Sequence, residues 1–456
     1  MSSTTLDASA LALATPPTRD RYVDLLRVGS LAVVILGHWL MAAPMTGPDG
    51  TVRVTNVLAL VPALRPLTWL LQVMPVFFLV GGYAQAKTLS HSPSYASFIR
   101  SRTTRLLRPT AVFAVVWLAL GTAAGLAGLD HDGLIRLALR TVAQPLWFLG
   151  VYLGVIALAP AMWRLHRRLG RRAVVVPVAL LAATALVDAL RFAGGHSSLA
   201  YLNLAFVWVG VHQLGFFYAD GSLRRAGGWL AGGGLAALIV LTTVGPYPVS
   251  MVGVPGEAVS NMSPPTLALA ACAVWLTGLV LLLRQRANRW LARARVWRVV
   301  VIGNLLTMTA FLWHLTAAFV VIGGALSFGG GLGAPVASAQ WWAQRPLWLM
   351  AYALVAGGLV AVFRRFDAPV AVEAPRTRVS DLGAAVGAAL CALGVLGLSG
   401  VGFAGLLDGH EGRLLVVSIT APAALGLVAG GAMLARLPLL PGRWRLRGTE
   451  NVGGRR

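Results

Sequence analysis

Long apolar stretches, separated by short segments that carry arginines, recur along the whole chain. A stretch of roughly 20 apolar residues can cross the hydrocarbon core of a bilayer as an α-helix. Twelve such stretches occur, and each predicts a transmembrane helix. They fall at about 22–43, 67–86, 109–128, 146–163, 173–192, 200–218, 228–245, 264–283, 299–322, 346–363, 382–407 and 414–435.

The segments between these stretches alternate between many and few arginines. Basic residues favour the cytoplasmic side of a membrane, so the rich segments are predicted to be cytoplasmic and the poor ones external. Both termini are then cytoplasmic. The external segments hold only Arg53, Arg65, Arg136, Arg140, Arg191, Arg345 and Arg413.

The composition agrees with this pattern, because 57% of the residues are hydrophobic and only 12% are charged. Soluble domains carry about 25% charged residues. The formal net charge of +23 would suggest a nucleic-acid partner in a soluble protein, but here the arginines follow the predicted topology. We therefore expect an all-α polytopic protein of the plasma membrane, with the lipid bilayer as a partner and no nucleic acid.

The chain divides into five predicted parts. Residues 1–18 have no basic start and are expected to be a flexible cytoplasmic tail rather than a cleaved signal peptide. Residues 19–366 form a ten-helix membrane domain. The charged, proline-containing segment 367–381 is expected to be a linker to a final helix pair, 382–436, and residues 437–456 form a basic cytoplasmic tail.

The first predicted helix contains two ionisable groups in RVGSLAVVILGH, namely Arg27 and His38. Eleven steps of 100° place both on one helix face, about 16 Å apart along the axis. An arginine at a helix end often extends to the headgroups, and a histidine near the outer interface is often only hydrogen-bonded. An ionisable group within the membrane nevertheless suggests function, and an imidazole can act as a base near neutral pH.

Three further segments carry recognisable patterns. MPVFFLVGGY (74–83) lies in the second predicted helix. FIRSRTTRLLRP (98–109) precedes the third, with arginines at positions 102, 105 and 108 on one side of its entrance. PLWFLGVYL (145–153) opens the fourth from the outside.

Together these segments resemble the membrane-bound acyltransferase family 3. An arginine, ten residues and a histidine are followed by FF-x-x-SG-F, by R-x-x-R before a proline, and by WFL; the resemblance covers roughly 19–365. The family includes enzymes that acetylate O-antigens and other glycans and enzymes that acylate macrolides. Two positions differ here, because Gly81 replaces the serine and Tyr83 the next aromatic residue.

The resemblance implies a role for several residues. His38 would remove the proton of an acceptor hydroxyl, and Arg27 would lie toward the donor. Arg102, Arg105 and Arg108 would bind the phosphates of acyl-CoA, a task for which guanidinium groups are well suited. The expected reaction is transfer of an acyl group, most simply acetyl, to a hydroxyl of a glycan, a lipid-linked sugar or a small molecule of the cell envelope.

Other polar and aromatic positions are weaker candidates. Phe78, Trp147 and His314 are expected to line the substrate cavity, although each also fits a packed or interfacial position. His212 and Asp188 are more simply explained as buried, hydrogen-bonded groups.

The sequence excludes some sites and leaves some alternatives open. No Walker A, CxxC, HExxH or GxSxG motif occurs, and no metal site is expected. A twelve-helix secondary transporter is the alternative function, although acidic residues are sparse within the helices. Self-association into a homo-oligomer is left open.

Overall fold

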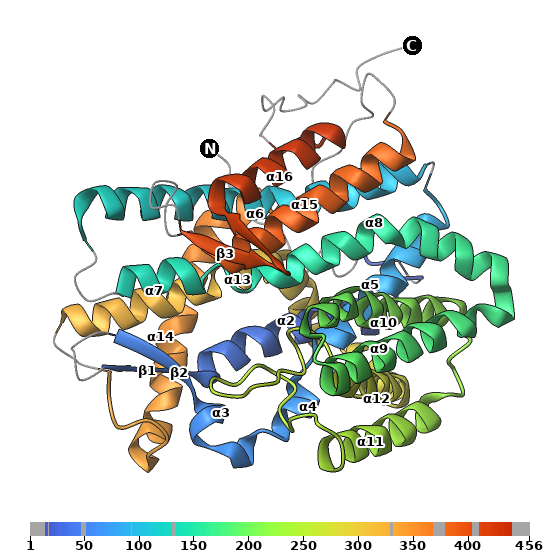
Figure 1. Ribbon diagram of the computed structural model, residues 1–456, viewed down its shortest axis with the longest axis horizontal. Helices are drawn as coiled ribbons and strands as arrows, with labels where there is room; N and C mark the ends of the chain where they lie inside the picture. The colour runs from blue at the N-terminus through green and yellow to red at the C-terminus, as the bar shows by residue number, and fades with distance from the viewer. Residues whose placement is uncertain are drawn as a thin grey trace, which may run out of the picture.

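The computed structural model describes residues 14–16, 18–46, 52–92, 94–129, 134–328, 332–367, 379–403 and 410–439. Helices account for 77% of it. The predicted N-terminal tail, linker and C-terminal tail lie almost wholly outside the described residues. The polytopic all-α class predicted from the apolar stretches agrees with this architecture (Figure 1).

Each of the twelve apolar stretches overlaps a helix. In the first half these helices are α2 (Arg21–Met41), α4 (Leu67–Leu71) with α5 (Met74–Leu89), α6 (Tyr95–Ala127), α8 (Leu146–Leu169), α9 (Val175–Gly194) and α10 (Asn203–Asp220). In the second half they are α11 (Gly227–Thr243), α12 (Leu267–Leu291), α13 (Ala294–Ser327), α14 (Ala339–Phe363), α15 (Asp381–Val401) and α16 (Ala421–Leu434).

Shorter elements connect these helices. They are α3 (Val57–Leu60), α7 (Leu134–Thr141) and the 3-10 turns η1 (Pro62–Leu64), η2 (Gly170–Val174), η3 (Ser197–Leu202) and η4 (Arg364–Phe366). Two antiparallel hairpins complete the set, β1 (Ala42–Thr46) with β2 (Val52–Asn56) and β3 (Glu411–Leu414) with β4 (Val417–Thr420). No strand was expected from the sequence. Both hairpins lie between long helices, and β3 with β4 takes the place of the first residues of the last predicted helix, 414–435.

Within the described residues, nine helical segments are long and apolar enough to cross a membrane, and one of them, Leu134–Gly194, includes α7, α8 and α9. The helices α11 and α16 are apolar but shorter. A multi-pass membrane protein is therefore supported. The number of twelve crossings and the cytoplasmic location of both termini stay predictions.

Several boundaries differ from the predicted ranges. Gln72 interrupts the second stretch and Pro75 restarts the helix, because proline is tolerated in a first turn. The third helix begins fourteen residues earlier than expected, at Tyr95, where Ser94 accepts a hydrogen bond from the Ser97 amide. It continues through Pro109. The arginines at 102, 105 and 108 therefore lie inside a helix rather than at its entrance.

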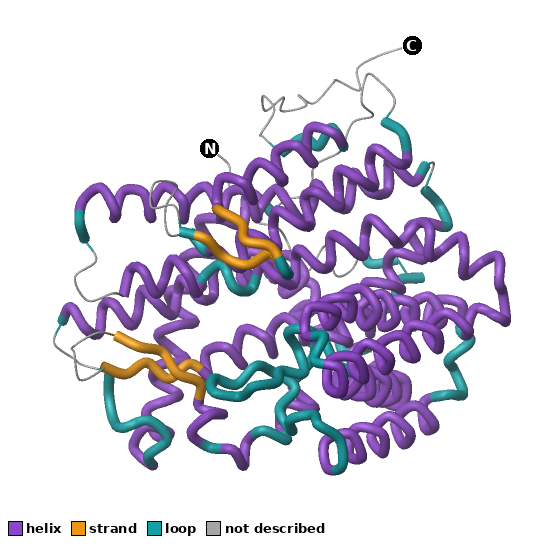
Figure 2. Tube along the Cα trace, in the orientation of Figure 1, coloured by secondary structure: helices purple, strands orange, loops and turns teal. Residues whose placement is uncertain are grey.

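The first long helix, α2, is surrounded by other long helices. The helix α2 contacts α5, α12, α13 and α14. Figure 1 shows α9, α10, α11 and α12 gathered on one side, while α15 and α16 lie side by side along another edge above α8. The loop 244–266, teal in Figure 2, closes over α4, where Trp69 Nε1 donates to the Val249 carbonyl at 2.7 Å.

The last helix pair is packed on the preceding helices at several points. The helix α15 contacts α8 and α6, and the Asp381 carboxylate accepts a hydrogen bond from the Ala96 amide at 2.9 Å. The buried Arg100 side chain donates to the carbonyls of Ala435 and Arg436 at 3.0 and 2.9 Å, which satisfies the free carbonyls after α16. These contacts tie the pair to the rest of the fold.

Candidate active site

The two histidines of the long central helices are in direct contact. Nδ1 of His38, near the end of α2, lies 2.8 Å from Nε2 of His314 in α13. The rings are nearly parallel, with an interplanar angle of 12° and centroids 5.0 Å apart. His314 is buried, with 1% of its surface exposed. The structure therefore brings together two residues that the sequence had predicted separately.

A backbone carbonyl fixes which ring nitrogens carry protons. Nδ1 of His314 lies 2.5 Å from the carbonyl oxygen of Phe311, and a carbonyl can only accept. Neutral His314 then has its proton on Nδ1 and a lone pair on Nε2. His38 must donate to that lone pair from Nδ1, which leaves Nε2 of His38 unprotonated. A free imidazole lone pair at this position can accept a proton from a substrate.

Arg27 is held on the same pair of helices. Its guanidinium donates to Oδ1 of Asn304 in α13 and pairs with Asp24 at 3.0 Å. Asn304 is oriented in turn by donating from Nδ2 to the Val300 carbonyl at 3.0 Å. Contacts from Arg27 to Asn304 and from His38 to His314 thus join α2 and α13 at two levels, so the two helices run parallel.

Asp24 is a buried carboxylate shared by two arginines. Arg19 also donates to it, at 2.5 and 3.1 Å. The Asp24 side chain is 8% exposed, whereas that of Arg27 is 31% exposed. Arg27 is therefore held by this ion pair and by its hydrogen bonds to Asn304.

An aromatic cluster packs beside the histidines. Phe78 stacks on Trp208 with centroids 4.5 Å apart, and Trp147 lies against the same indole at 6.0 Å. The cluster reaches His314 through Phe148 and Phe311, whose rings are 5.6 Å apart. The expected cavity residues Phe78, Trp147 and His314 therefore belong to one connected set, in which Phe78 is fully buried.

Tyr152 occupies the space beside Gly81. A Cβ atom added at Gly81 would lie 2.6 Å from the Tyr152 hydroxyl oxygen and 2.8 Å from its ring. The Tyr152 hydroxyl also accepts from Gln85 at 3.3 Å and lies within electrostatic range of Arg27 and Arg102. A hydroxyl group is therefore present beside position 81, supplied by another helix.

The three arginines of α6 that the resemblance assigns to phosphate binding have different surroundings. Arg102 donates to Oγ1 of Thr88. Arg105 is exposed and lies within electrostatic range of Arg27, Arg102 and Asp367. Within the described part of the chain, neither Arg105 nor Arg108 forms a hydrogen bond or ion pair. Burial raises the pKa of the Asp367 carboxyl, an effect that the charge of Arg105 opposes.

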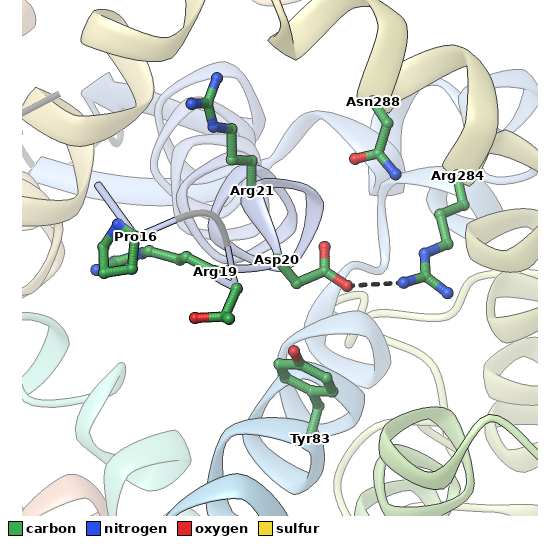
Figure 3. A pocket seen from close by; sticks show the side chains of 8 residues that line it. Pro16, Arg19, Asp20, Arg21, Tyr83, Arg284 and Asn288 are labelled. Carbon is green, nitrogen blue, oxygen red and sulfur yellow. Dashed lines mark hydrogen bonds and ion pairs between the residues drawn. The ribbon is translucent and has the colours of Figure 1, made fainter. Parts of the chain in front are cut away.

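A pocket of about 470 Å³ opens at the N-terminus of α2 (Figure 3). Its lining consists of Pro16, Thr18, Arg19, Asp20, Arg21, Tyr83, Arg284 and Asn288. Arg284 pairs with Asp20 at 3.0 Å, and Figure 3 shows Tyr83 on another side of the same carboxylate. Three guanidinium groups and one carboxylate leave the lining positively charged. Arg19 links this pocket to Arg27 through Asp24.

The two remaining polar candidates, Asp188 and His212, lie among packed side chains. Asp188 accepts hydrogen bonds from Asn203, Tyr247 and the Leu267 amide at 2.7–3.0 Å. His212 is buried against Phe216, as expected, but its Nε2 has no hydrogen-bond partner among the described residues. In the part of the chain that the structure describes, no three histidine, cysteine, aspartate or glutamate residues lie together as a metal site would require.

The sequence reasoning did not include Asp24, Asn304 or Tyr152. Asp24 lies three residues before Arg27, a spacing at which helical side chains meet, so this pair was detectable. Asn304 lies ten residues before His314, nearly the spacing of Arg27 and His38. Only the packing of α8 against α5 reveals Tyr152.

Comparison with known proteins identifies the family of this chain. A family model described as an acyltransferase domain, that of acyltransferase family 3, matches residues 20–364. No curated protein and no solved structure matches the chain.

Proposed function

Because the chain belongs to the membrane-bound acyltransferase family 3, we propose that it transfers an acyl group, in the simplest case acetyl, from acyl-CoA to an acceptor hydroxyl. The observation that carries the mechanism is the contact between His38 and His314, since it leaves Nε2 of His38 as a free base. The family match favours this reading over a secondary transporter.

The cytoplasmic arginines provide the donor site in this proposal. CoA carries a diphosphate and a separate phosphate on the ribose, so its nucleotide end needs more than one cationic contact. The arginines of α6 supply one group of cations and the pocket at the start of α2 supplies another. Arg27 lies within electrostatic range of Arg19 and Arg105, one from each group. The pantetheine arm would extend from there toward His38, about 16 Å further along α2.

The proposed reaction is a general-base acyl transfer. Nε2 of His38 takes the proton of the acceptor hydroxyl while the oxygen attacks the thioester carbonyl. The carbon–sulfur bond then breaks, the new ester forms, and the proton passes from His38 to the CoA thiolate. His314 stabilises the transient imidazolium through its hydrogen bonds to His38 Nδ1 and to the Phe311 carbonyl.

The acceptor is proposed to be a glycan, a lipid-linked sugar or a small molecule at the cell envelope. A bilayer enzyme with a cytoplasmic donor and a base in the outer half of α2 can reach an acceptor on the far side. Burial of the reacting groups also limits hydrolysis of the thioester.

Binding and turnover of acetyl-CoA test this proposal. The protein is purified in detergent, and CoA release is measured for the wild type, for His38→Ala, and for Arg102→Ala with Arg105→Ala. We expect His38→Ala to bind acetyl-CoA without turnover and the double variant to bind it weakly. Arg168→Ala changes an exposed arginine of α8 and is the matched control. Absence of acetyl-CoA binding by every form would contradict the proposed donor.

A further inference from the structure

One buried arginine, Arg345, has no hydrogen-bond partner among the described residues. Arg345 lies in the second turn of α14, although the sequence had assigned it to an external loop. Only 3% of its surface is exposed, and Nε, Nη1 and Nη2 all lack a hydrogen-bond partner among the described residues. A buried guanidinium of this kind is costly unless an anion pairs with it.

Two tryptophans cover the guanidinium without satisfying its donors. Cζ of Arg345 lies 4.0 Å from the ring centroid of Trp341 and 5.4 Å from that of Trp348. Such contacts stabilise the charge through the faces of the rings. The N–H groups lie in the guanidinium plane, so contacts with the ring faces leave all of their hydrogen bonds unmade.

A second unpartnered donor lies near Arg345. Tyr352 is fully buried, its hydroxyl has no hydrogen-bond partner in the described chain, and it lies within electrostatic range of the guanidinium. It follows Arg345 by seven residues, about two helical turns. Two buried donors without acceptors on one helix face indicate an acceptor that the chain itself does not supply.

This helix face is continuous with the histidine pair. The Tyr352 ring lies 5.7 Å from that of Trp39, the neighbour of His38 in sequence. Nε1 of Trp39 donates to the His314 carbonyl at 2.9 Å. Arg345 is thus connected to the proposed catalytic base through Tyr352 and Trp39. It approaches that base from the end of α14 that lies away from the cytoplasmic arginines.

Two other arginines of the fold have partners within the chain. Arg65 pairs with Glu257 at 2.9 Å, and the buried Arg100 donates to two carbonyls. Both have their charge or their donors satisfied within the chain. Arg345 differs from them because it has no hydrogen-bond or ion-pair partner in the described chain, and Arg100 shows that burial by itself does not cause this.

We propose that Arg345 and Tyr352 bind an oxyanion, a phosphate or carboxylate, carried by the acyl acceptor. The assignment to an acceptor rests on the proposed function, whereas the oxyanion site itself does not. A guanidinium fork matches two oxygens of either group, and the buried setting strengthens the pairing. The acceptor class is then narrowed to anionic molecules, such as sugars that bear phosphate.

Thermal unfolding in a phosphate-free maltoside detergent tests the site. Inorganic phosphate or glucose 1-phosphate is added at constant ionic strength to the wild type, to Arg345→Met, and to Arg413→Gln, which removes an exposed arginine of β3. At roughly 100 times Kd we expect the wild type and Arg413→Gln to gain about 5 °C in Tm. Phosphate bound at the cytoplasmic arginines shifts every form alike, so the smaller shift of Arg345→Met measures this site.

The outcomes separate the competing explanations. Equal increases in Tm for the wild type and Arg345→Met would overturn the oxyanion site, regardless of the result of the acetyl-CoA binding experiment. A difference seen with phosphatidylglycerol but not with either soluble phosphate would assign the site to a lipid headgroup and overturn the acceptor. If Arg345→Met does not fold, Tyr352→Phe and Arg345→Lys are used instead. The proposal then predicts a reduced Tm shift for Tyr352→Phe and a partly retained Tm shift for Arg345→Lys.

Discussion

The imidazoles of His38 and His314 form one hydrogen-bonded chain that ends at the Phe311 carbonyl, with links of 2.8 and 2.5 Å. Each ring carries its proton on Nδ1, so the chain has one free lone pair, on Nε2 of His38. The second histidine therefore fixes the tautomer of the first, in addition to filling space beside the aromatic cluster.

Substitutions of the two histidines should have graded effects. His38→Gln removes the base and should lower acyl transfer by about 10²–10⁴-fold. His314→Phe keeps the aromatic packing but loses the acceptor for His38 Nδ1, so the loss should be smaller, with acetyl-CoA affinity retained. Rates of CoA release and equilibrium binding are measured side by side. His196→Gln changes an exposed histidine and should behave as the wild type; wild-type rates in His314→Phe would contradict the tautomer argument.

The carboxylate of Asp24, shared by Arg19 and Arg27, should contribute to the stability of the fold. Asp24→Ala leaves Arg27 without its counter-ion, and we expect a loss of about 2 kcal/mol in the free energy of unfolding. This is less than the 3–5 kcal/mol of a fully buried pair, because Arg19 is half exposed. Chemical denaturation measures the loss, with Glu411→Gln at an exposed position as control. Unchanged stability would show that Asn304 alone holds Arg27.

The site could be predicted only in part, because helical periodicity relates residues within one helix and not residues on different helices. The spacing of Arg27 and His38 placed both on one face of α2, and the apolar stretches located the helices. The contact of His38 with His314 joins positions 276 residues apart, and no local pattern specifies such a pairing. The early start of α6 was missed because four arginines interrupt its apolar stretch, although helix propensity and the Ser94 cap favour a helix there.

The interpretation of Arg345 was wrong for a related reason. When the limits of a helix are set by hydropathy alone, an arginine at the edge of the apolar stretch is assigned to the adjoining loop. The stacked Trp341 and Trp348 allow the helix to begin earlier and to bury the charge. Burial of this kind depends on which residues face the guanidinium, and the sequence does not give that information.

Glycines at the crossing of α5 and α10 should tolerate substitution unequally. A Cβ atom at Gly82 would collide with the backbone carbonyl of His212 in α10, so Gly82→Ala should cost about 1–3 kcal/mol. Gly81→Ala meets only the Tyr152 side chain, which can move, and should cost less. Gly37→Ala meets nothing within 4 Å and is the control. Thermal unfolding ranks the three; equal values would indicate that α5 and α10 do not approach as closely as described.

The pocket at the start of α2 can be tested by removing one phosphate from the donor. We expect the wild type to bind acetyl-CoA roughly tenfold more tightly than its 3′-dephospho form, since one charge-assisted contact contributes about 1.5 kcal/mol or more. Arg284→Gln removes a cation from the pocket and should abolish that preference. Arg286→Gln changes an exposed arginine of the same helix and should retain it. If Arg284→Gln weakens both donors equally, the residue acts through its pairing with Asp20 and the ribose phosphate binds elsewhere, because only direct contact makes the effect depend on that phosphate.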